Sequence, residues 1–272
     1  MEWVNVLGCP ITRLSLSDFA VKMEEFIASR KSHYVAVVNV AKLVKMRSDK
    51  ELEQSVLAAD LVGADGVPLL WASRLFGTPL PDRVNGTDLM YELLRKADQK
   101  GYRIFFFGAT AEVLQKVLDV VQQEYPGVQI AGSRHGYFAA KDEPAIVKAI
   151  RESRADILFI AFGTPKKEVW VKRYLHAMEV PVIHGVGGSF DVLAGVIPRA
   201  PVWMQKNGLE WFFRLLQEPG RMWQRYLYTN TVFLLLLGKE VIIKLMRSDR
   251  TEATSERIRT SAKNRVAKPS DG

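Results

Sequence analysis

The sequence contains one cysteine, Cys9, and four histidines in 272 residues. A single cysteine forms no internal disulfide, which favours a reducing compartment such as the cytoplasm. The histidines are widely spaced and no two lie four residues apart, so they offer no metal site of their own. Disulfide-stabilised secreted proteins and histidine-based metalloenzymes are therefore disfavoured.

Several motifs of common enzyme classes are also missing. The nearest approach to G-x-G-x-x-G, at residues 185–190, has Phe190 in place of the third glycine, and there is no Walker sequence. Residues 187–191 lack the final glycine of a nucleophile elbow. These absences disfavour a nicotinamide or flavin oxidoreductase and a serine hydrolase. The metal-binding motif Asp-x-Asp does not occur either.

No uninterrupted apolar run reaches the roughly 20 residues that span a bilayer. The longest approach, residues 231–246, is interrupted by Gly238, Lys239 and Glu240. We therefore expect this segment to lie in the core or against a membrane surface without crossing it. The amino terminus lacks the basic start and apolar stretch of a secretory signal and is interpreted as the mature start.

The charge that is present is mainly basic, with 38 Lys and Arg against 30 Asp and Glu and a net charge of +8. Such a balance attracts phosphorylated ligands, anionic lipid or nucleic acid. Residues 198–225 combine tryptophan, phenylalanine and arginine, and an apolar stretch follows them. That order suits a lipid surface better than a nucleic acid, so we predict no nucleic-acid partner.

Short β-rich runs alternate with longer amphipathic segments along most of the chain. This alternation predicts an α/β fold, a Rossmann-like parallel sheet with helices on both faces. The expected strands are residues 34–39, 59–64, 103–107, 128–131, 157–162 and 182–186. The expected helices are residues 48–58, 67–76, 86–97, 112–124, 144–153 and 166–178, with another from about residue 41.

The composition changes twice near the carboxyl terminus. Residues 1–195 read as an α/β core built from two β-α series, about 1–100 and 101–195. Residues 196–246 are predicted to form a helical appendage that associates with a membrane. Residues 247–272 are polar and charged, and we expect them to be disordered.

Asp65 stands in the segment Gly63-Ala64-Asp65-Gly66, between an expected strand and an expected helix. A carboxylate in such a loop is exposed while the scaffold holds it still, so it is suited to accept a proton from a hydroxyl group. The alternative is a helix cap or an Asx turn, and the local pattern alone favours that alternative.

Seven sequence blocks together resemble the WecG/TagA/CpsF glycosyltransferase family over roughly residues 1–228. Individually several blocks are weak, but their order and spacing are specific. They are ADGVPLLWASRLFG (64–77), DRVNGTDLM (82–90), FFFGAT (105–110), GTPKKEVW (163–170), GVGGSFDVLAG (185–195), PRAPVW (198–203) and GLEWFFRLLQEPGRMWQRY (208–226).

The resemblance implies an inverting transferase that needs no metal and no cofactor. It implies transfer of N-acetylmannosamine from a UDP-sugar to a sugar linked to undecaprenyl diphosphate, a polyprenyl lipid, in cell-surface polysaccharide or teichoic acid-type synthesis. The enzyme would lie on the inner face of the plasma membrane, and a homo-oligomer is left open. The implied general base is Asp65, the diphosphate ligands are Arg214, Arg221 and Arg225, and the substrate-binding residues are Asn39, Arg83, Lys167, Glu168, Gly187, Gly188 and Asp191.

Two positions depart from the family pattern. Val37 stands where many members have threonine, and Lys167 stands where they have glutamine. Losing a hydroxyl and replacing an amide by a cation changes which sugar hydroxyls find a partner. The donor therefore stays open, with UDP-glucose in exopolysaccharide synthesis as the alternative to UDP-N-acetylmannosamine.

Overall fold

The computed structural model describes the backbone of residues 1–266, and the side chains of residues 1–246 except those of Lys206, Arg221 and Leu245. Its centre is a six-stranded sheet in the order β4-β3-β8-β7-β5-β6, with every pair parallel. The strands are β3 (His33–Val38), β4 (Leu61–Ala64), β5 (Arg103–Gly108), β6 (Gln129–Arg134), β7 (Ile157–Ala161) and β8 (Val182–Gly185). The predicted α/β class is confirmed.

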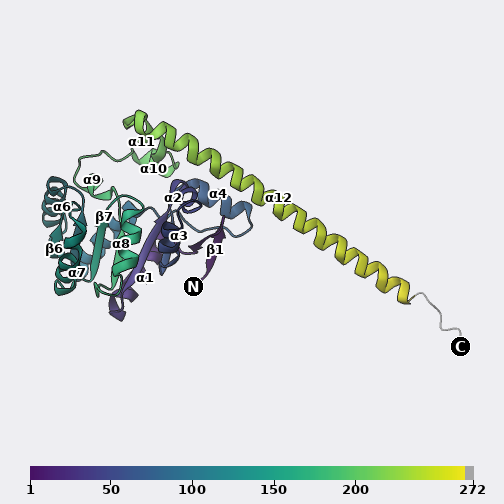
Figure 1. The fold of residues 1–272 in the computed structure, drawn as a ribbon, viewed down its shortest axis with the longest axis horizontal. Coiled ribbons are helices and arrows are strands. Elements are labelled where there is room, and N and C mark those ends of the chain that lie inside the picture. The colour runs from purple at the N-terminus through teal and green to yellow at the C-terminus, as the bar shows by residue number, and fades with distance from the viewer. Residues whose placement is uncertain (267–272) are drawn as a thin grey trace.

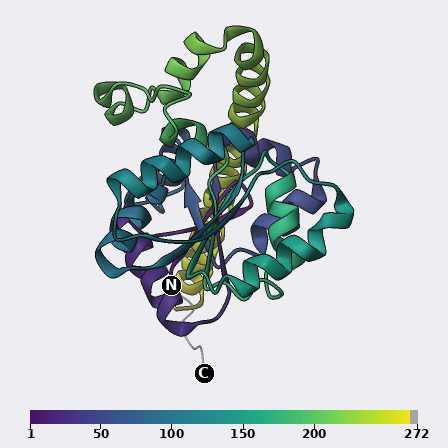
Figure 2. The ribbon, with the colours of Figure 1, turned by 90° about the vertical axis from the view of Figure 1, so that its left-hand side faces the viewer.

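Helices cover both faces of this sheet (Figure 2). One hydrophobic cluster packs the sheet against α2 (Val40–Met46), α3 (Lys50–Leu57), α4 (Val67–Leu75), α7 (Glu143–Glu152) and α8 (Lys166–Tyr174). A second packs the other face against α1 (Leu16–Ser29), α5 (Gly86–Lys100), α6 (Ala111–Glu124) and α9 (Ser189–Leu193). A short 3₁₀ turn, Ala140–Asp142, precedes α7.

The central strands are apolar on both sides because both faces are covered. In β7, Leu158 and Ile160 enter the first cluster, while Ile157 and Phe159 enter the second. Successive side chains of a strand point to opposite faces, so a strand buried on both sides has no polar alternation. This explains why the sequence shows continuous apolar runs here.

An antiparallel hairpin of β1 (Trp3–Val6) and β2 (Cys9–Thr12) precedes α1. Its two-residue loop, Leu7-Gly8, has positive φ at both positions, as the tight turns of hairpins require. The Thr12 hydroxyl accepts a hydrogen bond from the backbone N–H of Val62 in β4, 2.9 Å away. The hairpin therefore supports β4, the outermost strand of the sheet, which Asp65 follows.

The carboxyl-terminal appendage consists of α10 (Val202–Lys206), α11 (Glu210–Gln217) and α12 (Pro219–Val266). Figure 1 shows α12 passing along the α/β core and then extending well beyond it. Met222, Thr229 and Phe233 are buried, and α12 packs beside α2. The appendage is thus anchored to the core by one face of the first half of α12.

The boundary predicted between the appendage and the disordered tail, after residue 246, falls inside α12, which continues to Val266. Residues 247–266 are polar but contain neither proline nor glycine, so nothing in the backbone chemistry stops the helix there. Residues 267–272 lie outside the described residues. The division into a core, an appendage and a disordered tail stays a prediction.

The stretch Met222–Lys244 is long and apolar enough to cross a membrane by length and composition. The sequence analysis counted only uninterrupted apolar residues, whereas this stretch is apolar on average and includes a few charges. Length and composition alone do not show that it crosses a membrane, and the expected location in the core or against a membrane surface stays a prediction. Part of this stretch packs on the core through Phe233, as described above.

Candidate functional site

The predicted site residues of the core lie at the carboxyl ends of the parallel strands. Asn39 follows β3, Asp65 follows β4, and Gly187 follows β8. Because β4, β3 and β8 are neighbours in the sheet, these three positions come from adjacent strand ends. Ligands of open α/β sheets bind outside this edge.

Asp65 is half-buried at this edge, and its backbone N–H donates to the carbonyl of Val38 over 2.8 Å. Burial raises the pKa of its carboxyl to about 6, with Arg83 and Arg214 acting in the opposite direction and Glu210 and Asp88 in the same one. A carboxylate with this pKa is available as a base near neutral pH. The N-cap of α4 is Gly66, so Asp65 does not fill the capping role that its local pattern favours.

Asn85 is a site residue that the sequence analysis missed. Its side-chain Nδ2 donates to Oδ1 of Asp65 over 3.1 Å. Its Oδ1 accepts the backbone N–H of Thr87 at 2.7 Å and thereby caps α5. The cap fixes the orientation of the amide, so a donor faces Asp65. An asparagine just before the predicted helix at 86–97 was the signal that a sequence offers for this role.

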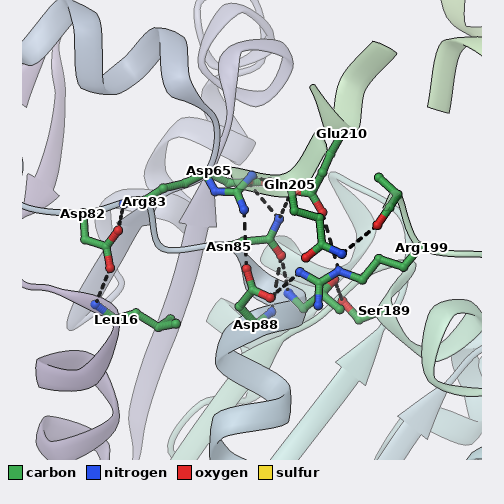
Figure 3. A network of polar contacts seen from close by, with 12 residues as sticks. Leu16, Asp65, Asp82, Arg83, Asn85, Asp88, Ser189, Arg199, Gln205 and Glu210 are labelled. Carbon is green, nitrogen blue, oxygen red and sulfur yellow. Dashed lines mark hydrogen bonds and ion pairs between the residues drawn. The ribbon is translucent and has the colours of Figure 1, made fainter. Parts of the chain in front are cut away.

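Two arginines and two carboxylates form a closed ring of ion pairs beside Asp65 (Figure 3). Arg83 pairs with Asp88, at 3.6 Å, and with Glu210. Arg199 pairs with the same two carboxylates, with 3.5 Å between its Nε and Oε1 of Glu210. The side chains of the ring are between 17% and 25% exposed, so the pairs are shielded from solvent on most sides.

Glu210 belongs to α11, so the ring joins the appendage to the α/β core. Its Oε2 also accepts a long hydrogen bond from Nδ2 of Asn85, at 3.5 Å. The sequence blocks of the family resemblance contain Arg199 and Glu210, but the sequence analysis gave neither of them a role. Arg83 was predicted to position substrate, and the structure places it in this ring, close enough to Asp65 to affect its pKa.

The three predicted diphosphate ligands differ in their location relative to Asp65 and in what the structure describes of them. Arg214 lies near Asp65 and Asp191, since its charge lowers the pKa of both carboxyls. Arg225 is exposed on α12 and does not belong to the charges that most affect Asp65. The side chain of Arg221 lies outside the described residues. The structure thus brings Arg214 near Asp65, and the base role of Asp65 and the diphosphate roles of all three arginines stay predictions.

Lys167 and Glu168 are buried below the edge of the sheet rather than open to it. Oε1 of Glu168 lies 2.6 Å from Nζ of Lys167 and 2.7 Å from Nζ of Lys42, and Thr164 bonds to both Lys167 and Glu168. Burial lowers the pKa of Lys167 to about 8. Burial opposes ionisation of Glu168, yet the two ammonium groups bring its pKa down to about 2. Lys42 is a further member that the sequence analysis missed.

The remaining predicted positions also lie at this edge. Asn39 caps α2, with its Oδ1 accepting the backbone N–H of Lys42 at 3.0 Å. Gly187 has a φ of 57°, a conformation that glycine adopts without strain. Gly188 is the N-cap of α9, which carries Asp191, and burial raises the pKa of the Asp191 carboxyl. Among side chains that the structure describes, no three His, Cys, Asp or Glu residues are grouped as metal ligands.

Exposed large apolar side chains gather on α4 and on the appendage. Large apolar side chains exposed in number on neighbouring elements often mark contacts with partners or membranes. The exposed residues are Trp71 and Leu75 of α4, Val202 and Trp203 of α10, Trp211, Phe212 and Leu216 of α11, and Trp223, Leu227, Tyr228, Leu234, Leu235, Ile242 and Met246 of α12. We call this set the apolar surface.

Comparison with known proteins finds relatives that match most of the chain. A relative in Bacillus spizizenii is 35% identical over 213 residues, covering 78% of this chain and 82% of the relative. A Bacillus subtilis relative is 32% identical over 241 residues, with 88% and 93% covered, and one in Staphylococcus aureus is 30% identical over 224 residues, with 82% and 86% covered. All three are named N-acetylglucosaminyldiphosphoundecaprenol N-acetyl-beta-D-mannosaminyltransferase.

A sequence model of one family matches residues 4–247, which include the α/β core and the first half of α12. This match and the relatives confirm the resemblance that the seven sequence blocks indicate. The chain belongs to the glycosyl transferase WecG/TagA/CpsF family and is a glycosyltransferase.

Proposed function

We propose that the enzyme transfers N-acetylmannosamine from UDP to N-acetylglucosaminyl-diphosphoundecaprenol, with inversion at the anomeric carbon. The acceptor and the sugar are those in the names of the relatives. The observation that carries the chemistry is Asp65, a half-buried carboxyl with a pKa of about 6 and with Arg83 and Arg214 nearby. A half-buried carboxyl with a raised pKa, next to cations that suit an anionic donor, supports this proposal.

In the proposed reaction, Asp65 accepts the proton of an acceptor hydroxyl while the hydroxyl oxygen attacks the anomeric carbon. The bond from that carbon to the diphosphate breaks on the opposite face, and the electron pair leaves with UDP. A positioned base contributes about 10²- to 10⁴-fold to such a step. The donor hydrogen bond from Asn85 keeps the carboxylate oriented.

The departing diphosphate needs positive charge, because the oxygen that leaves the anomeric carbon gains a negative charge on a group that is already anionic. Arginine serves this purpose since its planar guanidinium binds phosphate oxygens in pairs. Arg214 lies near Asp65 and is exposed, so it is available to a ligand. We propose that Arg214, together with Arg221 and Arg225, stabilises the leaving group in place of a metal ion.

The choice of donor sugar depends on the residues that lie beneath the carboxyl ends of the strands. Lys167 is held by Glu168 and Thr164, and Val37 lies near Gly86 at the start of α5. Because Lys167 is buried, we propose that it alters the charge beneath the sugar, and that Val37 alters the shape of the surface next to the sugar. UDP-glucose remains the alternative donor.

We propose that the apolar surface rests on the cytoplasmic face of the plasma membrane, where a lipid-linked acceptor is found. Tryptophan and tyrosine favour the membrane–water boundary, and both types are exposed on α12. The basic balance of the chain adds attraction to anionic lipid. Anchoring through α12 would bring the acceptor to Asp65 without a spanning segment.

The direct test is a donor screen with purified full-length protein and a short-chain lipid-diphosphate N-acetylglucosamine, with products identified by mass. Transfer from UDP-N-acetylmannosamine is expected. Transfer from UDP-glucose alone would show that UDP-glucose is the donor instead. A parallel melting experiment compares UDP with NAD and an oligonucleotide. A ligand at 100 times its Kd stabilises a protein by about 2.7 kcal/mol, so UDP alone should raise the melting temperature. No shift with UDP would contradict the proposed donor class.

A further inference from the structure

The helix α11 carries Arg214 to the site, yet it contributes no fully buried side chain to the core. None of its side chains from Glu210 to Gln217 is buried. Trp211, Phe212 and Leu216 are exposed. Helices in water owe most of their stability to packing, and α11 packs mainly on α12, where Trp211 contacts the ring of Tyr226. The ion pairs of Glu210 join α11 directly to the α/β core.

Glu210 supplies these polar contacts. Its carboxylate closes the ring with Arg83 and Arg199, and both arginines also pair with Asp88 of α5. Without Glu210, two partly buried guanidinium groups would share one carboxylate. Breaking a shielded ion-pair network is far more disruptive than breaking a surface pair.

The chain just before α11 also touches the core closely. Gly208 has a φ of +70°, and a Cβ at this position would lie 2.2 Å from Cγ2 of Val67. Val67 is the first residue of α4, two residues after Asp65. The backbone just before α11 thus packs closely against the start of α4, next to Asp65.

Glu210 and Arg214 are four residues apart on α11, so their side chains lie on the same face of the helix. Fixing Glu210 in the ring therefore also fixes the direction in which Arg214 projects. We propose that Glu210 is a positioning residue: it latches α11 onto the α/β core and thereby sets Arg214 beside Asp65. The catalytic part of this inference rests on the proposed function, whereas the latch rests on the contacts alone.

The electrostatics of the base agree with this role. The charged groups that act most on Asp65 are Arg83 from the loop before α5, Asp88 of α5, and Glu210 and Arg214 of α11. The charge of Glu210 raises the pKa of Asp65. Removing that charge lowers this pKa, whereas displacing Arg214 raises it. The effect of Glu210 is the larger of the two, so the acid limb of the kcat/KM profile should move to lower pH.

The test uses the full chain with Glu210→Gln, which keeps the size and removes the charge, and Glu210→Asp, which keeps the charge on a shorter side chain. Glu240→Gln is the matched control, because Glu240 is exposed farther along the appendage. Hydrogen exchange of residues 208–217 should become severalfold faster in Glu210→Gln, less so in Glu210→Asp, and remain unchanged in Glu240→Gln. Unchanged exchange in both Glu210 variants would overturn the latch, and Glu210→Asp keeps the test open should Glu210→Gln misfold.

Kinetics with a short-chain acceptor test the action through Arg214. Misplacing a catalytic group by about 1 Å lowers activity about 10²-fold, and Glu210→Gln should fall in that range, with its acid limb at lower pH. If Glu210 acts through Arg214, Glu210→Gln/Arg214→Gln is no slower than Arg214→Gln. Additive losses would overturn the positioning role. A wild type without transfer from any UDP-sugar, but with faster exchange in Glu210→Gln, would reject the proposed function and support the latch.

Discussion

The amide of Asn85 bonds to Asp65 with one end and caps a helix with the other. Nδ2 donates to Oδ1 of Asp65 over 3.1 Å, and Oδ1 accepts the N–H of Thr87 over 2.7 Å. Because the backbone N–H can only donate, the amide cannot turn around without losing the cap. The start of α5 thus fixes a hydrogen-bond donor at the proposed base, and this coupling leads to a first prediction.

Replacing Asn85 separates its two roles. Serine retains a cap for α5 but does not reach Asp65 with an amide, and alanine loses both contacts. Asn85→Ser and Asn85→Ala should each lower kcat/KM by about 10- to 100-fold, the worth of a hydrogen bond to a charged group. Only Asn85→Ala should also lose about 1 kcal/mol of unfolding free energy, the usual effect of a lost cap. Rates and urea unfolding measure the two effects, and equal rates in both variants and the wild type would exclude the contact from catalysis.

Asp65→Ala should reduce transfer by about 10²- to 10⁴-fold, the contribution of a general base. The wild-type kcat/KM should fall as the pH drops below about 6, because the base must be ionised. UDP binding, followed by calorimetry, should stay largely intact, since Arg214 remains. Unchanged turnover would remove Asp65 from the base role, and lost folding in circular dichroism would show a structural role instead.

The same pKa predicts that Asp65 destabilises the folded protein. Burial raises the pKa of this carboxyl from 3.8 to about 6, so the folded state binds more protons than the unfolded chain between these values. Stability due to this group is therefore present at low pH and is lost as the pH rises through this window. The stability of Asp65→Asn relative to wild type should increase as the pH rises from 4 to 7, and it should change little above pH 7. Thermal melts across this range check it, with the exposed Asp119→Asn as the control; a constant difference would contradict the raised pKa.

The buried cluster around Glu168 gives a prediction about stability. Glu168 is fully buried and bridges the ammonium groups of Lys42 and Lys167. Glu168→Gln leaves two buried cations without their counter-charge, which typically costs about 3–5 kcal/mol. Glu53→Gln is the control, because Glu53 forms a surface pair with Lys50 and should change stability by about 0–1 kcal/mol. Similar denaturant midpoints for the two variants would show that the cluster is not ionised as described.

Local chemistry made most of the fold predictable. Apolar runs predicted the six parallel strands. Asp65 was singled out only by the family resemblance, because its local pattern alone favoured a helix cap or an Asx turn. The sequence analysis made no assignment for the hairpin β1–β2, because its strands have four residues each and carry little periodicity. Nor did it foresee that Lys167 would be buried, since a lysine in a loop-to-helix segment looks exposed.

The ring around Glu210 was beyond local reasoning for a different reason. Arg83 and Glu210 are 127 residues apart, and Arg199 and Asp88 are 111 apart. Each of these residues looks like an ordinary surface charge within its own segment. They become a site only when the appendage folds back onto the edge of the sheet, which depends on tertiary packing.

The apolar surface predicts how the enzyme meets lipid. Trp223, Leu227 and Leu234 are all more than half exposed on α12, so their replacement by serine should leave the core intact. Burying one large apolar side chain is worth about 1.5–3 kcal/mol, and losing three should weaken binding to anionic phospholipid vesicles at least about tenfold, as measured by co-sedimentation. Tyr137→Ser, which removes an exposed aromatic ring outside the appendage, is the control. Transfer to a short-chain acceptor should persist in the triple variant, because that acceptor does not need the membrane.

Vesicle binding that survived the three substitutions would contradict surface docking through this face. Binding that also resisted alkaline extraction would indicate that Met222–Lys244 spans the bilayer instead.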